Sequence, residues 1–90
     1  MTLSLARIEQ ILTRTKEDTN YYEWNGLSSK NWEICVFYGM TEFPDGLNCQ
    51  GVWKEQWGVL IDNDELVMTT SNRQKMIDFL MSLELREDEN

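Results

Sequence analysis

Residues 31–40 read NWEICVFYGM and predict the clearest strand in the chain. One set of alternate positions includes Ile34 and Val36, and the other set includes Cys35 and Phe37, so both sets are apolar. Because successive side chains of a strand point to opposite faces, this pattern is typical of a strand covered on both sides over part of its length. The stretch therefore predicts a sheet in which this strand is central.

Other strands are predicted on either side of this one. Residues 52–61, VWKEQWGVLI, form a second long strand with a charged first half and an apolar second half. The sequence DNDE at 62–65 then favours a tight turn into a strand at 66–69, and this hairpin is the best-supported tertiary contact in the sequence. A short aromatic strand is predicted at 21–24, followed by a turn at the NG pair, 25–26, and a loop longer than a two-residue hairpin.

Helices are predicted at both ends of the chain. Residues 4–17 have apolar side chains at i, i+3 and i+7 spacing, with Ser4 as the N-cap. A second helix begins at Ser71, where Gln74 three residues later completes a capping box. The acidic stretch at 85–90 is unfavourable at a helix C-terminus, so it is expected to fray. The apolar stripe of the second helix is Met76, Ile77, Leu80 and Leu83.

The predicted order is helix, about four antiparallel strands, helix. Two helices on one face of such a sheet give a two-layer α+β domain. Ninety residues suffice for one such core, so the chain is interpreted as a single domain over residues 1–90. Residues 41–51, interrupted by PDG at 44–46, are expected to form an exposed loop. Phe43 at its edge is either a contact residue or a side chain that folds back onto the core.

The composition excludes several kinds of chemistry. The chain has no histidine, which rules out Ser-His-Asp and Cys-His catalysis within it, and two cysteines are too few for a structural zinc site. No phosphate-binding glycine motif occurs, and Leu66 occupies a ligand position of the only calcium-loop candidate, so no cofactor or metal is expected. The pI of about 4.3 argues against direct nucleic-acid binding. We expect a protein that is not an enzyme.

The sequence also bears on location and redox state. It has no run of about 18 apolar residues, and its start lacks the pattern of a secretory signal. A soluble, cytoplasmic protein with no membrane partner is therefore expected. Cys35, in an apolar run, and Cys49, in the loop, are interpreted as reduced thiols, with a disulfide between them as the alternative.

The acidic excess is concentrated in the second half of the chain. Residues 1–41 carry four basic and five acidic side chains, a net charge of −1, whereas residues 42–90 carry four and eleven, a net charge of −7, which together give −8. Four tryptophans accompany this charge, more than one small core easily buries whole. A negative surface with exposed aromatic anchors suits contact with a basic protein.

These features predict a small acidic inhibitor, like an immunity protein or a phage anti-defence protein, that binds a basic, nucleic-acid-handling partner as a nucleic-acid mimic. One alternative is a homodimeric accessory subunit or secretion-type chaperone with an adaptable methionine surface. Another leaves every tryptophan in the core, with the acidity serving solubility alone. Under the inhibitor hypothesis, the charge is expected from Asp62, Asp64, Glu65, Glu84, Glu87 and Asp88, and the anchors from Phe43, Trp53 and Trp57.

Overall fold

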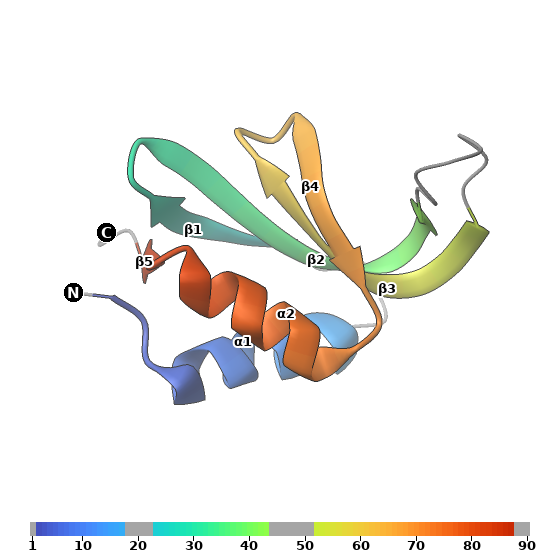
Figure 1. Cartoon of the computed structure of the whole chain (residues 1–90), viewed down its shortest axis with the longest axis horizontal. Coiled ribbons are helices and arrows are strands. Elements are labelled where there is room, and N and C mark those ends of the chain that lie inside the picture. The colour runs from blue at the N-terminus through green and yellow to red at the C-terminus, as the bar shows by residue number, and fades with distance from the viewer. Residues whose placement is uncertain (1, 18–22, 44–51, 88–90) are drawn as a thin grey trace.

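The computed structural model describes residues 2–17, 23–43 and 52–87, without the side chains of 42–43 and 52–54. The strands form one antiparallel sheet in the order β4-β3-β2-β1-β5, and both helices lie on the same side of it (Figure 1). This confirms the predicted two-layer α+β architecture, with a fifth, short strand added. The elements are α1 (Leu5–Glu17), β1 (Glu23–Ser29), β2 (Trp32–Phe43), β3 (Val52–Ile61), β4 (Glu65–Thr70), α2 (Arg73–Ser82) and β5 (Arg86–Glu87).

The core lies between the helices and one face of the sheet. Alternate residues of β2 and β3 point into it, among them Ile34, Val36 and Trp57. Because the apolar side chains recur every two residues in the strands and every three or four in the helices, each element presents one continuous apolar side to this space. The helices contribute Ile8, Ile11 and Leu12 from α1 and Met76, Ile77 and Leu80 from α2.

β2 is the central strand, as its apolar pattern predicts. It pairs with β1 on one side and with β3 on the other. Cys35 and Phe37 point away from the helices, and yet they are only 2% and 6% exposed. The ring of Phe37 covers Gly58, its direct partner on β3. The face of the sheet away from the helices, here called the open face, therefore has a small apolar layer of its own.

The β3–β4 turn forms where the DNDE sequence predicts it. Asp62 and Asn63 have φ angles of 54° and 58°, the left-handed conformation that a type I′ turn requires at both central positions. Asp62 also forms two hydrogen bonds with Glu33 of β2, the strand beside β3. Its carboxylate accepts a hydrogen bond from the Glu33 amide at 3.0 Å, and its own amide donates to the Glu33 carbonyl at 2.8 Å. These bonds fix the turn against the start of β2.

The prediction of a turn at residues 25–26 is wrong. β1 continues through them, with a register shift between Trp24 and Leu27. Gly26 has a φ of 85°, so the NG pair forms a β-bulge inside the strand. The chain reverses later, in a two-residue connection that begins at Lys30, and the expected long loop is absent here. The positive φ that makes NG a good turn equally suits a bulge.

The predicted loop at 41–51 is shortened by the strands on both sides. Residues 41–43 continue β2 and pair with the first residues of β3. The rest of that loop, which contains Cys49, lies outside the described residues, as do residues 21–22 of the strand predicted at 21–24.

Both helices begin with a side-chain cap. The hydroxyl of Ser4 accepts a hydrogen bond from the amide three residues later at 3.2 Å, as predicted for α1. α2 is capped by Asn72, whose side chain accepts from the Lys75 amide at 3.0 Å, one residue beyond the predicted cap at Ser71. Asparagine caps as well as serine, and β4 extends to Thr70, so Ser71 is left as the connection.

The C-terminal segment up to residue 87 packs on the core and the sheet, whereas the sequence predicts a frayed stretch at 85–90. Leu85 is 1% exposed and belongs to the core. Arg86–Glu87 then form β5 along the edge of β1. The guanidinium of Arg7 donates to the Glu87 carboxylate at 2.5 Å. Burial of one leucine outweighs the unfavourable charge at the helix end, which acts only near the last turn and is screened by salt.

Candidate protein-binding surface

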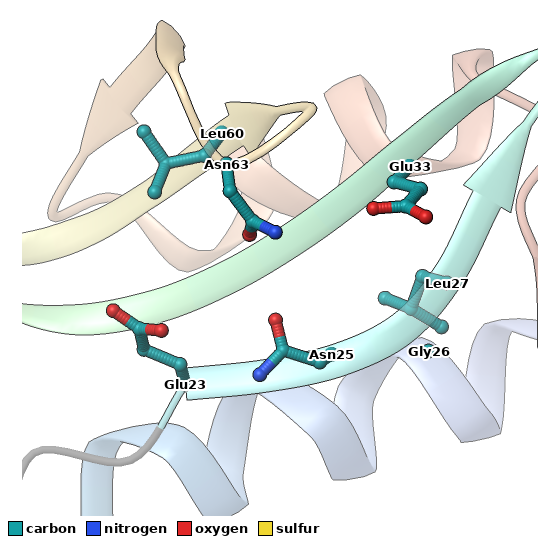
Figure 2. Close-up of a pocket in the computed structure, with 7 residues that line it drawn as sticks. All are labelled: Glu23, Asn25, Gly26, Leu27, Glu33, Leu60 and Asn63. Atoms are coloured by element: carbon teal, nitrogen blue, oxygen red, sulfur yellow. The ribbon is translucent and has the colours of Figure 1, made fainter.

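The open face of the sheet contains a pocket of about 420 Å³ (Figure 2). It lies across β2, between the bulge in β1 and the β3–β4 turn. A bulge bends its strand and increases the local twist, which opens space beside it. The lining residues are Glu23, Asn25, Gly26, Leu27, Glu33, Leu60 and Asn63.

Strand pairing explains why these side chains meet. Side chains opposite one another on neighbouring strands lie on the same face of a sheet. Glu23 is opposite Phe37 and Leu60 is opposite Cys35, so both lie on the open face. Glu33 precedes Cys35 by two residues and shares its orientation. Two exposed carboxylates from different strands therefore lie beside an apolar side chain.

The polar groups of the pocket are mostly hydrogen-bond acceptors. Figure 2 shows the side chains of Asn25 and Asn63 pointing toward one another from β1 and the β3–β4 turn, across β2. The carboxylates of Glu23 and Glu33 accept hydrogen bonds only, and each amide adds a carbonyl acceptor and an NH₂ donor. The lining residues include neither lysine nor arginine. The pocket is therefore negative and rich in acceptors.

The pKa of the Cys35 thiol is affected by the charge of Glu23. Cys35 lies on the same face between Glu33 and Phe37 and is a free, buried cysteine. Burial, and secondly the charge of Glu23, raise the pKa of the thiol to about 11. The thiol is therefore protonated at neutral pH and is a poor nucleophile.

Two of the six acidic residues predicted to bind a partner lie beside this pocket. Asp62 and Asp64 are exposed in the turn on either side of Asn63, which lines the pocket. Glu65 is also exposed, but it is opposite Ile61 and so belongs to the helix side of the sheet. The turn therefore divides its acidic side chains between the two faces.

Of the other three predicted acidic residues, the two that the structure describes lie away from the pocket. Glu84 is exposed just after α2, where its backbone is left-handed with a φ of 52°. Glu87 is neutralised by Arg7 within the protein. Asp88 lies outside the described residues. Glu84 and Glu87 do not extend the acidic surface around the pocket.

The expectation that Trp57 is an exposed anchor is wrong. Trp57 is 2% exposed, and its indole N–H donates to the carbonyl of Leu12 in α1 at 3.0 Å. It is a core residue that joins the helix to the sheet, because its position on β3 faces inward and its polar atom finds a buried partner. The side chains of Phe43 and Trp53 lie outside the described part of the structure. Trp32, which the sequence did not single out, is 47% exposed at the start of β2.

Sequence reasoning missed the carboxylates that line the pocket. Glu33 precedes Cys35 by two residues, which predicts that both side chains lie on the same face of β2. The sequence pattern does not show which other acidic residues lie near Glu33. Glu23 could not be connected with it because the NG pair at 25–26 was interpreted as a turn rather than as a bulge within the same strand. The available signal was an isolated glycine in a strand, which often marks a bulge.

An apolar strip lies beside the pocket on β4. Leu66 is opposite Leu60 and is 38% exposed, and Val67 next to it is 36% exposed. β4 is at one edge of the sheet formed by the described strands, so its outer backbone groups are available for contact. Apolar side chains surrounded by polar ones are typical of the surfaces that proteins use to bind one another.

The chain matches no known protein-family model, no curated protein and no solved structure. Within residues 2–17, 23–43 and 52–87, no group of three or more cysteine, aspartate or glutamate side chains is placed to hold a metal ion. None of the described helices has the length and hydropathy needed to span a bilayer.

Proposed function

We propose that this protein is a small acidic inhibitor that binds a basic protein partner through the open face of its sheet. The observation that carries the proposal is the pocket with Glu23 and Glu33 on separate strands and Asp62 and Asp64 in the adjoining turn. Carboxylates held on a rigid sheet can occupy the positions of phosphates on a partner that normally handles nucleic acid. We also propose an immunity-like or anti-defence-like role in the cytoplasm.

The charges on the open face are not compensated within the pocket. Its lining has two carboxylates and no cation, whereas the ion pair found among the described side chains, Arg7 with Glu87, is on the α1–β5 side. Unpaired negative charges on one face steer a positive partner and speed its association. The strip formed by Leu66 and Val67 offers apolar area next to them. Charge would then supply orientation, and burial of this strip would supply part of the affinity.

The proposal is tested by capturing partners from the native host, identifying them, and measuring the affinity of the purified complex at increasing salt. We expect a basic protein whose affinity falls steeply as salt approaches about 1 M, because the screening length shrinks to about 3 Å. The double substitution Glu33→Gln with Asp64→Asn should weaken binding, and Glu9→Gln with Glu17→Gln, which removes the same charge from α1, should not. An affinity that is independent of salt would contradict the proposal.

The alternative, a homodimeric accessory subunit, is supported by the edge strand β4 with its exposed Leu66 and Val67. Of the methionines that would form an adaptable surface, Met40 and Met81 are 59% and 44% exposed, whereas Met76 is in the core. Light scattering coupled to size exclusion distinguishes the two functions. A dimer that becomes a monomer on Val67→Lys, which places a charge on the edge, would favour the alternative.

A further inference from the structure

We propose that the pocket binds the guanidinium group of one arginine side chain of the partner. This inference rests on the proposed function and specifies which group of the partner enters the open face. A guanidinium is a planar cation with five N–H donors and no acceptor. The group that enters the pocket must therefore find acceptors in several directions at once.

The arrangement of acceptors meets this requirement. Glu23 approaches from β1 and Glu33 from β2, so the two carboxylates lie on separate strands. Asn25 and Asn63 add amide oxygens from the bulge and from the β3–β4 turn, and their side chains point toward one another across the pocket (Figure 2). A lysine ammonium has only three donors around one nitrogen, so it would leave more of these acceptors unpaired. The fork of an arginine fits better.

The pocket also accommodates the apolar part of an arginine side chain. Leu60 lines it, and Leu66 on the neighbouring strand is opposite Leu60. Arginine packs its methylene groups along apolar surface while its charged end makes hydrogen bonds. At the bulge, a Cβ added to Gly26 would meet no atom within 4 Å, which shows that the space above this residue is open.

The charge of the pocket also acts on the neighbouring Cys35. The charge of Glu23 contributes, after burial, to the raised pKa of the Cys35 thiol. One of the chain's own cations, Arg86, lies on the same face by register, because it is opposite Ser28 and Ser28 is opposite Glu33. Among the described side chains Arg86 makes no ion pair and is exposed. Among the described side chains, Glu23 and Glu33 likewise make no ion pair.

A titration of the ¹⁵N-labelled full chain tests this inference with three small probes. The probes are the N-acetyl amides of arginine, lysine and citrulline, the last being an uncharged counterpart of arginine with nearly the same shape. We expect saturable chemical-shift changes at Asn25, Gly26 and Asn63 with the arginine probe, several-fold weaker binding of the lysine probe, and no saturable change with citrulline. Equal responses to all three probes, or changes spread over the acidic surface, would overturn the inference.

Two variants and a matched control identify the groups responsible. Glu23→Gln and Glu33→Gln should each weaken the arginine probe by about threefold or more, in the range expected for a partly exposed charge pair. Glu55→Gln removes the same charge from an exposed position on the helix side of β3 and should leave the affinity unchanged. Thermal melts should show all three variants to be folded. If Glu55→Gln weakens the probe as much as the pocket variants, the binding is diffuse and the inference is wrong.

The outcomes also separate this inference from the proposed function. If Glu33→Gln with Asp64→Asn weakens a basic, salt-sensitive partner but the arginine probe does not bind in the pocket, the arginine pocket is rejected and the inhibitor function stands. If the arginine probe binds in the pocket but the identified partner is neither basic nor sensitive to salt, the pocket stands and the inhibitor function is rejected.

Discussion

The phenyl ring of Phe37 lies over Gly58, its direct partner across the β2–β3 ladder. A Cβ at position 58 would come within 2.3 Å of Cζ and 2.6 Å of Cε1 of this ring. The ring is 6% exposed and has little room to move away. Glycine is therefore required at position 58 by the close approach of a neighbouring side chain, since its φ is not in the left-handed region.

The substitution Gly58→Ala should lower the free energy of unfolding by about 1–3 kcal/mol, the usual cost of overpacking. Urea denaturation measures this change. In a Phe37→Leu background the smaller side chain leaves space for the added methyl group, so the cost of Gly58→Ala should be smaller there. Equal costs in the two backgrounds would show that the ring is not the obstacle.

The indole of Trp57 should matter for stability and not for contact with a partner. Trp57→Phe removes the hydrogen bond to the Leu12 carbonyl and leaves a void in the core, so we expect a loss of about 1–3 kcal/mol in the free energy of unfolding. Trp32→Phe is the matched control. Because Trp32 is half exposed, its substitution should change stability by less than about 0.5 kcal/mol. The interpretation fails if the two variants are equally stable.

Much of the fold could be predicted because the spacing of apolar residues in the sequence matches the pattern of buried side chains in the structure. The apolar alternation at residues 31–40 identified β2 as the central strand, and DNDE identified the β3–β4 turn. β5 could not be predicted, because its two residues have no periodicity of their own and depend on Leu85 and on the ion pair between Arg7 and Glu87. These are contacts between the ends of the chain, which local patterns do not encode.

The candidate site was less predictable for a related reason. The charge distribution along the chain predicts six acidic contact residues, of which Asp62 and Asp64 flank Asn63 in the turn beside the pocket. The pocket itself depends on a change of register between Trp24 and Leu27, which brings Glu23 and Glu33 onto one face. The NG sequence is compatible with both a turn and a bulge, and only pairing with β2 decides between them.

The thiol of Cys35 should be unreactive in the folded protein at neutral pH. It is 2% exposed, and its pKa is raised to about 11. In a Cys49→Ser variant, which leaves Cys35 as the sole thiol, reaction with a chromogenic disulfide at pH 8 should be slow and should accelerate in urea. Fast reaction without denaturant would show that the Cys35 thiol is accessible to the reagent in the folded protein.

The raised pKa of Cys35 also predicts a dependence of stability on pH. The folded state holds the thiol proton more tightly than the unfolded state, in which the pKa is near 9.0. This contribution is therefore complete below pH 9 and is lost as the pH rises through about 11. Because lysines and tyrosines titrate in the same range, the comparison is with Cys35→Ala. The stability of the wild-type chain relative to this variant should fall between pH 9 and 11.

The C-terminal segment should contribute stability through Leu85 rather than through its charges. Leu85→Ala removes a side chain that is 1% exposed and should cost about 2–5 kcal/mol in urea denaturation. Glu87→Gln breaks the ion pair with Arg7, but both side chains are about one third exposed, so the loss should not exceed about 1 kcal/mol. Leu66→Ala, at a leucine that is 38% exposed, controls for the loss of the same side-chain atoms. If Leu85→Ala costs no more than Leu66→Ala, the segment does not belong to the core, and β5 would depend on the Arg7–Glu87 ion pair and its pairing with β1.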